Sequence, residues 1–131
     1  MMGKLGPIER TSNAIRTGEV TATRVVTHAL EQIEKLDSKL NSVVMTCAES
    51  ALEQAANIDR DGSSSALAGV PALIKDLEDI EGLPTRKGSA AFADRPPATS
   101  DGVVPSRLKQ AGAIVVGKST LPEFALEGYT S

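Results

Sequence analysis

The segment TATRVVTHALEQIEKLDSKL, residues 21–40, carries apolar residues at spacings of three and four. These spacings place the apolar side chains on one stripe of a helix. The stripe consists of Val26, Ala29, Leu30, Ile33 and Leu36. Thr21 stands just before the pattern, where a threonine side chain can cap the first turn. We therefore predict a helix that begins after Thr21, with His28 on its opposite, solvated side.

Residues 46–58 predict a second helix. The order Thr46-Cys47-Ala48-Glu49 has the T-x-x-E form of a capping box. The apolar positions that follow at helical spacing are Ala48, Ala51, Leu52, Ala55 and Ile58. A helix amino terminus can lower the pKa of a thiol, but no base near Cys47 is identifiable. We interpret Cys47 as a small buried hydrophobic side chain.

The stretch GVPALIKDL, residues 69–77, predicts a strand over 70–77 with a lysine near its end. Side chains alternate along a strand, so Lys75 shares a face with Leu73 and Leu77. The other face carries Val70, Ala72 and Ile74. Because a lysine is rarely buried without a partner, Lys75 either extends to water or is held inside for a chemical purpose.

The residues after this strand predict loops. The acidic run Asp76, Glu78, Asp79 and Glu81 lacks the spacing and the terminal glutamate of an EF-hand, so we interpret it as a solvated loop. Glycine and proline then punctuate residues 81–100 too often for a helix or strand of ordinary length. Long ordered loops of this kind often lie beside functional sites.

A third helix and a second strand are predicted between residues 100 and 116. Ser100 or Asp101 can cap the helix, which tolerates Pro105 in its first turn and ends at Gly112. Its inward-facing residues are expected to be Val104, Leu108 and Ala111. Residues 113–116 form a continuous apolar run that is typical of a buried parallel strand, and a last short helix is expected near Leu121.

The composition narrows the classes of function. The chain has 131 residues, 40% of them apolar, and a net charge of -3, which fits one folded, soluble domain and disfavours nucleic acid as a partner. No secretory signal or membrane-spanning run occurs, so we predict a cytoplasmic protein that does not bind membranes. One cysteine, Cys47, and one histidine, His28, give no metal cluster, and we expect no cofactor.

One segment matches a nucleotide-binding motif. Residues 112–119, GAIVVGKS, satisfy the P-loop expression G-x-x-x-x-G-K-[ST]. A P-loop follows a strand, whereas here a helix is predicted before Gly112 and the intervening residues are themselves a strand, so nucleotide binding is disfavoured.

No G-x-S-x-G elbow occurs, and His28 faces solvent. A lysine that takes the proton of a serine hydroxyl is the remaining base.

The runs LAGVPALIKDLEDIEGLPTRKGS and SDGVVPSRLKQAGAIVVGKSTLPEFAL resemble the amidase signature family in order, spacing and residue type. The resemblance covers about residues 21–124. It implies an α/β fold with helices packed on a mixed sheet, and an enzyme that hydrolyses carboxamide C–N bonds. The family's Ser-cisSer-Lys triad takes its lysine from the G-V-P-x-x-x-K-D context, which assigns the general base to Lys75. Apolar neighbours such as Leu73 and Leu77 would favour the uncharged amine that a base requires.

The family's two triad serines lie in a later segment of the form G-G-S-S-G-G, which residues 1–131 do not contain. Ser63, Ser64 and Ser65 precede the lysine and lack the glycines, so we interpret them as a loop. Residues 1–131 are therefore expected to form the amino-terminal portion of a single amidase domain with an incomplete sheet. We expect the isolated chain to be inactive; the alternative is a non-catalytic remnant that acts as a binding or interaction module.

The expected partner of the complete enzyme is a small-molecule amide. The isolated chain is also expected to self-associate through unpaired sheet edges, because apolar segments such as residues 113–116 require neighbours.

Overall fold

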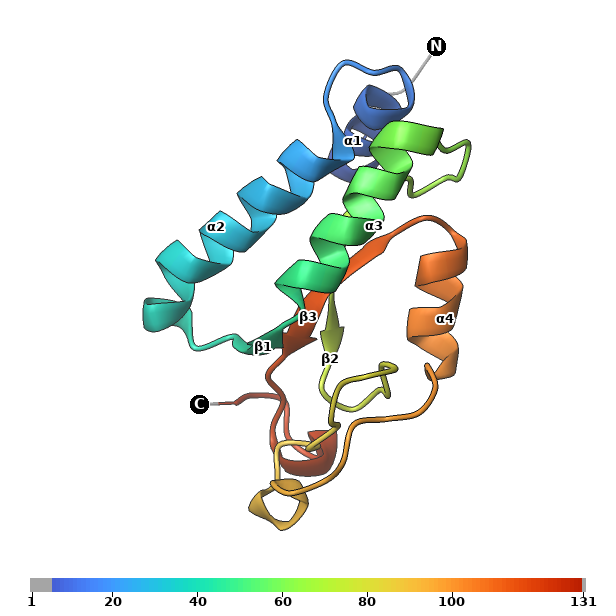
Figure 1. The fold of residues 1–131 in the computed structure, drawn as a ribbon. Helices are drawn as coiled ribbons and strands as arrows, with labels where there is room; N and C mark the ends of the chain where they lie inside the picture. The colour runs from blue at the N-terminus through green and yellow to red at the C-terminus, as the bar shows by residue number, and fades with distance from the viewer. Residues whose placement is uncertain (1–5, 131) are drawn as a thin grey trace.

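The fold is built on a three-stranded mixed sheet with helices on both faces (Figure 1). The computed structural model describes residues 6–130. Strand β3 (Ile114–Ser119) lies in the centre, between β1 (Val43–Thr46) and β2 (Pro71–Lys75). β2 runs parallel to β3, and β1 runs antiparallel to it. The expected fold class, helices on an incomplete mixed sheet, is confirmed.

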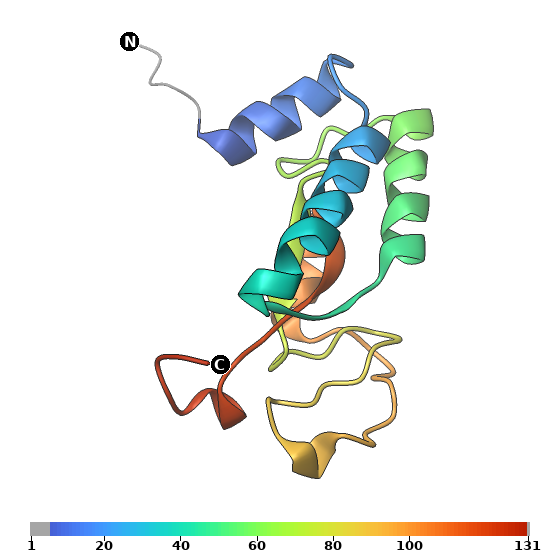
Figure 2. The same cartoon turned by 90° about the vertical axis from the view of Figure 1, so that its left-hand side faces the viewer.

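Two helices cover one face of this sheet. α2 (Ala22–Leu40) and α3 (Ala48–Asp61) lie side by side and pack chiefly against β3, while α1 (Pro7–Arg16) crosses near the start of α2 (Figures 1 and 2). The buried side chains of this core are Ile15, Ala22, Val26, Ala51, Ala55, Ile114 and Val116. Three of them are alanines, and their small side chains let the helix backbones approach the strand closely.

The opposite face carries a smaller core. α4 (Val103–Gln110) packs against β3, and Val115 alternates to this side between Ile114 and Val116. Val115, Ile74 and Ile80 are buried there, with Leu108, Leu83 and Cys47 packed around them. The buried strand predicted over residues 113–116 is thus correct, although the strand continues to Ser119.

The predicted start of α2 is confirmed. The Thr21 side chain accepts a hydrogen bond from the Arg24 amide, as an N-cap does. Asp59 of α3 adds two further acceptors at the same helix end, 2.6 Å from the Ala22 amide and 3.0 Å from the Thr23 amide. Burial raises the pKa of Asp59, but hydrogen bonds from the Thr23 side chain and from the Thr23 and Ala22 amides outweigh it and lower the pKa overall. His28 lies on the surface of α2 and is not part of either core, as predicted.

Several boundaries differ from the predicted ones. The capping box at Thr46 is wrong: Thr46 ends β1, and Cys47 occupies the N-cap of α3 without a side-chain cap. α4 begins at Val103 after Gly102, and its buried residue is Pro105, whereas Val104 is 49% exposed. Leu108, also predicted to face inward, does pack against the smaller core.

The long loop prediction is confirmed over most of residues 81–100. Only isolated bridges, Ile80 with Leu83 and Glu81 with Ala98, and a one-turn 3-10 helix at Ala90–Phe92 interrupt it. The short helix expected near Leu121 is a 3-10 turn at Glu123–Ala125. Within residues 6–130, no helix combines the length and apolar character needed to cross a bilayer.

Candidate active site

Two lysines stand at the carboxyl ends of the parallel strands β2 and β3. Lys75 is the last residue of β2, and Lys118 precedes the last residue of β3. In the observed register Ile74 is opposite Lys118, and Lys75 is opposite Ser119. Residues that lie opposite each other in neighbouring strands point to the same face, and side chains alternate along each strand. The two lysine side chains therefore leave the sheet on opposite faces.

An irregularity in the β2–β3 ladder produces this arrangement. Ala72 is opposite Val115, but Leu73 is opposite Gly117, so Val116 is an extra residue in β3. A bulge of this kind changes which face the following side chains point to. Gly117 also lies against the Met45 carbonyl of β1, where a Cβ atom would collide with the backbone. Glycine at this position lets the three strands remain paired around the bulge.

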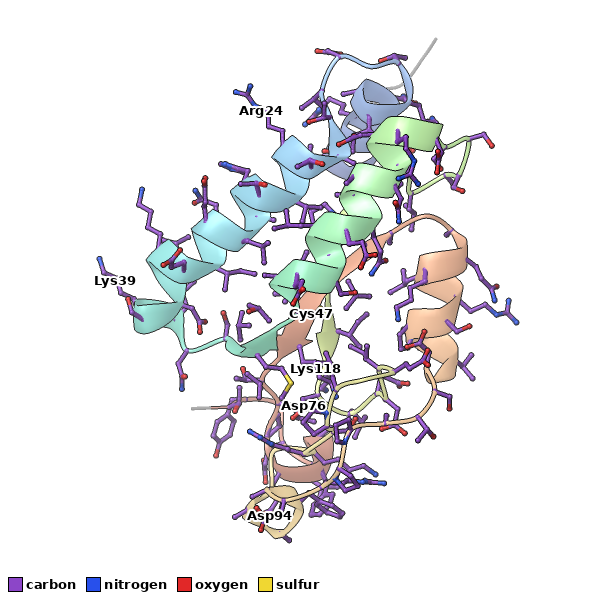
Figure 3. All side chains as sticks on the ribbon, in the orientation of Figure 1. Arg24, Lys39, Cys47, Asp76, Asp94 and Lys118 are labelled. Atoms are coloured by element: carbon purple, nitrogen blue, oxygen red, sulfur yellow. The ribbon has the colours of Figure 1, made fainter. Side chains whose placement is uncertain are left out.

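The Lys118 side chain is fully buried and fully partnered. Its Nζ lies 2.8 Å from Asp76 Oδ1 and donates to Thr85 Oγ1 at 2.8 Å and to the Pro84 carbonyl at 3.1 Å. Lys118 is 0% exposed and Asp76 is 1% exposed. Figure 3 shows Lys118 and Asp76 together where β2 and β3 end. Burial of a charge costs several kcal/mol unless a partner compensates it, and here the two charges compensate each other.

Asp76 has further partners in the loop that follows. Both carboxylate oxygens accept from the Arg86 amide at 3.3 Å. The Asp76 carbonyl accepts from the Lys87 amide at 3.1 Å, and the Asp76 amide donates to the Ser119 carbonyl at 3.0 Å. Within residues 6–130, no buried side-chain nitrogen or oxygen lacks a hydrogen-bond partner. The buried ion pair is thus part of a satisfied polar network.

This arrangement corrects the interpretation of the acidic run as a solvated loop. Asp79 and Glu81 lie outside the buried core, but Asp76 is buried. The prediction failed for Asp76 because its partner, Lys118, comes from a distant strand. A sequence signal did exist, since Lys118 follows a run of buried residues in β3 and a lysine in such a strand requires a counter-charge.

Lys75 has the opposite environment: its side chain is exposed. Leu73, on the same face of β2, and Leu77, in the turn that follows the strand, are 40% and 38% exposed. Of the two alternatives left open for Lys75, residues 6–130 show the first: the side chain extends to water. The physical reason is that α2 and α3 pack mainly over the central strand, which leaves the end of the edge strand β2 uncovered.

A pocket of about 580 Å³ opens beside Asp76. Its polar lining includes Asp76, Arg86, Ser89, Thr120, Glu123 and Tyr129. Ser89 donates a 2.6 Å hydrogen bond to Glu123 Oε1, and the Phe124 amide donates to the Lys87 carbonyl at 2.8 Å. These bonds hold residues 122–126 against the loop at 87–92. The volume suits a small organic molecule, although Lys75 does not line the pocket.

A larger groove of about 780 Å³ runs between α1 and α2 and is lined by residues that include Arg10, Arg24 and His28. Neither strand-end lysine lines it, so this groove is separate from the ends of β2 and β3. Among residues 6–130, no group of three or more histidine, cysteine, aspartate or glutamate side chains could hold a metal ion.

Cys47 behaves as a structural residue. Its side chain is half-buried, and Sγ donates to the Val115 carbonyl at 3.1 Å. Burial raises the pKa of this thiol, and the positive charge of Lys109 only partly offsets that effect. A thiol with a raised pKa is a poor nucleophile at neutral pH, which agrees with the sequence interpretation.

The P-loop alternative fails on geometry. α4 ends at Gln110, before Gly112, and the residues Ile114–Ser119 form a strand. The lysine of the motif, Lys118, is buried against Asp76. A P-loop instead wraps backbone amides around the phosphates and directs its lysine toward them.

Helices packed on an incomplete mixed sheet are the architecture that this chain shares with amidase-signature structures. A bacterial aryl acylamidase of the amidase signature enzymes has a similar fold, with a TM-score of 0.82 and 25% identity, over 91% of this chain and 27% of that structure. The Amidase family model matches residues 24–131, and the chain belongs to this family.

Curated relatives agree with this assignment. The chain is 40% identical over 118 residues to a glutamyl-tRNA(Gln) amidotransferase subunit of Maridesulfovibrio salexigens, which is 88% of this chain and 24% of that protein. It is 38% identical over 124 residues to indoleacetamide hydrolase of Bradyrhizobium diazoefficiens, which is 92% of this chain and 24% of that protein. The chain thus spans about a quarter of the length of these relatives.

Proposed function

We propose that the protein acts in the hydrolysis of carboxamide C–N bonds, with residues 1–131 forming a portion of a single amidase domain and Lys75 serving as the general base. The observation that carries this proposal is the contrast between the two strand-end lysines. Lys118 is engaged by Asp76, whereas Lys75 extends from the end of β2 with its side chain in solvent. Of these two amines, Lys75 is the one that a serine hydroxyl can approach.

The proposed chemistry follows from the family resemblance. The uncharged Lys75 amine accepts a proton through a bridging serine, the second serine attacks the amide carbonyl, and the proton then passes to the leaving amine. Water subsequently hydrolyses the acyl-serine. No Gly/Ser-rich segment of the family type occurs in residues 1–131, so both serines would come from other residues. We accordingly predict no turnover by the isolated chain.

Covering the open face would prepare Lys75 for this role. A lysine is a base only when its amine is uncharged, and removal from water favours the uncharged form. Leu73 and Leu77 precede and follow Lys75 in the chain and are partly exposed. Further protein packed against these leucines would surround the amine with apolar groups while leaving the strand end in place.

The substrate class is proposed from the relatives. The names of the two relatives refer to glutamyl-tRNA(Gln) amidotransfer and to indoleacetamide hydrolysis, and both reactions concern a carboxamide. We propose a small primary amide as substrate. The name of the first relative also identifies it as one subunit of an enzyme, which supports a further protein chain as a partner. A cytoplasmic location remains our prediction.

A chimeric enzyme tests the proposal. Residues 21–124 replace the matching segment of the Bradyrhizobium indoleacetamide hydrolase, and ammonia release from indoleacetamide is measured. We expect turnover, and we expect Lys75→Met to reduce kcat at least about 1,000-fold because the base of a triad is lost. Lys35→Met, at an exposed position of α2, is the matched control and should leave kcat within about twofold.

Circular dichroism decides whether each chimera is folded. A folded, active chimera in which Lys75→Met retains its kcat would refute the base role. Ammonia release by the isolated 131-residue chain, abolished by Lys75→Met, would instead refute the requirement for serines from elsewhere.

A second candidate is a non-catalytic interaction module. The partly exposed Leu73 and Leu77 beside the edge strand β2 favour it, because edge strands pair readily with other chains. Sedimentation velocity of the isolated chain over a range of concentrations tests self-association through this edge. A single monomeric species at every concentration, with a concentration-independent melting temperature, would contradict it.

A further inference from the structure

The buried ion pair holds the residue that follows Lys75. Asp76 is bound through its amide to Ser119, through its carbonyl to Lys87, and through its carboxylate to Lys118 and Arg86. Ile74, on the other side of Lys75, is buried in the smaller core. The position of the Lys75 backbone is thus set by an apolar contact on one side and by the polar contacts of Asp76 on the other.

The same pair connects three segments that are separate in sequence. Lys118 belongs to the end of β3, Asp76 follows the end of β2, and Pro84 and Thr85 belong to the loop that covers them. β2 is an edge strand with β3 as its sheet neighbour, and strand ends at an edge tend to fray. The loop and the ion pair take the place of a second neighbouring strand at this end.

We propose that Lys118 and Asp76 are positioning residues for Lys75, an inference that rests on the proposed base role of Lys75. The two charges hold the end of β2 from one face of the sheet, while the Lys75 side chain leaves from the other face. The network therefore fixes the backbone from which the base projects without occupying the space that a serine and a substrate require.

The chemistry of the Lys118–Asp76 pair supports a role in positioning Lys75 over a role in stability alone. Apolar side chains of similar volume are often as stabilising as a buried ion pair. An ion pair with hydrogen bonds to a carbonyl, a hydroxyl and an amide instead permits one arrangement of the three segments. Misplacement of a catalytic group by about 1 Å can reduce a rate on the order of 100-fold, so such precision has a functional consequence.

Hydrogen exchange followed by mass spectrometry on the 131-residue chain is the primary test. The double variant Lys118→Met/Asp76→Asn removes both charges without leaving one of them unpaired. We expect amide exchange in peptides covering residues 72–77 and 85–88 to become at least about tenfold faster, with peptides from α2 and α3 unchanged.

The chain offers a matched control. Lys109 and Asp101 form another ion pair, also with a 2.8 Å separation, which links α4 to the loop before it. The variant Lys109→Met/Asp101→Asn should leave exchange at residues 72–77 within about twofold. Unchanged protection of residues 72–77 in Lys118→Met/Asp76→Asn, or equal loss of protection in both double variants, would overturn the proposal.

A milder variant covers the case in which the double variant does not fold. Thr85→Val removes one acceptor from Lys118 and keeps the shape of the side chain, whereas Thr85→Ser keeps the hydroxyl. We expect Thr85→Val to speed exchange at residues 72–77 and Thr85→Ser to restore wild-type exchange. If both variants exchange like the wild type, the network does not hold the strand end.

The active chimera supplies a readout that loss of stability alone would not produce. Lys118→Met/Asp76→Asn should lower kcat about 100-fold, with KM within about twofold, under conditions where the folded fraction is unchanged. An unchanged kcat in a folded variant would overturn the positioning role. An inactive chimera with wild-type residues would count against the proposed function, whereas the exchange experiment on the 131-residue chain would still decide whether the pair holds the end of β2.

Discussion

Lys75 and Lys118 leave the ends of adjacent parallel strands, one toward solvent and one into the protein. Lys118 is buried with a carboxylate, a hydroxyl and a carbonyl around its ammonium group, and Lys75 is exposed between two partly exposed leucines. The residue type alone therefore does not assign chemistry. Surroundings make one lysine a structural cation and leave the other available for reaction.

The two lysines also differ in what their removal should do. Lys118 neutralises a buried charge, so its loss leaves Asp76 without a counter-charge. Among residues 6–130, no carboxylate lies within ion-pair distance of Lys75. Loss of Lys118 should therefore lower the free energy of unfolding more than loss of Lys75, and loss of Lys75 should lower kcat more than loss of Lys118.

The largest effect on stability should come from Lys118→Met alone. This change leaves the Asp76 carboxylate buried and unpaired, and breaking a buried pair in this way costs about 3–5 kcal/mol. The free energy of unfolding, measured by urea denaturation, should fall by that amount. The double variant Lys118→Met/Asp76→Asn should recover part of the loss. A decrease below about 1 kcal/mol for Lys118→Met would mean that water or another cation compensates Asp76.

Thr85→Val should have the next largest effect. The valine cannot accept the hydrogen bond from Lys118, and leaving a buried donor partly unsatisfied costs about 1–3 kcal/mol. The same urea measurement checks it, with Thr85→Ser as the control that keeps the hydroxyl. If serine and valine destabilise equally, packing of the missing methyl group, and not the hydrogen bond, explains the loss.

The Asp101–Lys109 pair should contribute less to the free energy of unfolding, and its contribution should depend on pH. Burial raises the pKa of Asp101, but the hydrogen bonds from Lys109 and the Glu81 amide outweigh it and lower the pKa overall. Its contribution is present above the unfolded pKa of about 3.9 and is lost as the pH falls through the lower folded value. Asp101→Asn should remove about 1 kcal/mol or less at pH 7.

The free energies of unfolding of wild type and Asp101→Asn check this pH dependence. They are measured at pH 7 and at about pH 2, below the ordinary pKa of an aspartate. The difference in unfolding free energy between the two proteins should shrink as the pH falls. A difference that grows in acid would show that the charged form of Asp101 is not the stabilising one.

The smallest effect on stability should come from Lys75→Met. The side chain is exposed, and substitutions at such positions usually change stability by no more than about 0.5 kcal/mol. The same variant carries the largest expected loss of kcat in the chimera, and the two results together would separate a reactive lysine from a structural one. A loss of stability comparable to that of Lys118→Met would place the two lysines in the same structural role.

Local patterns in the sequence predicted much of the fold. The helical stripe after Thr21 and the apolar runs around Ile74 and Val115 indicated α2, β2 and β3, because periodicity reports which side of an element is buried. The family membership followed from the order of short motifs. The four-residue strand β1 and the helix α1 were missed, since β1 is too short for a clear alternation and α1 has too few apolar residues to mark a helical stripe.

The candidate site was harder to predict than the fold. The role assigned to Lys75 is still a prediction. Its side chain is exposed in residues 6–130, and the cover of a sheet face depends on tertiary packing that local patterns do not report. Burial of Asp76 was missed for a related reason: the carboxylate sits in an acidic run that looks solvated until Lys118 of another strand is placed beside it. Neighbours in space decide these questions, and one sequence does not specify them directly.

The extra residue in β3 explains how the two amines come to be so different. If the ladder continued regularly from the pairing of Ala72 with Val115, Lys75 would lie directly opposite Lys118, and like charges at such a position repel. The bulge at Val116 instead sends the two ammonium groups to opposite sides of the sheet. A one-residue irregularity in backbone pairing thus sorts two identical side chains into two separate environments.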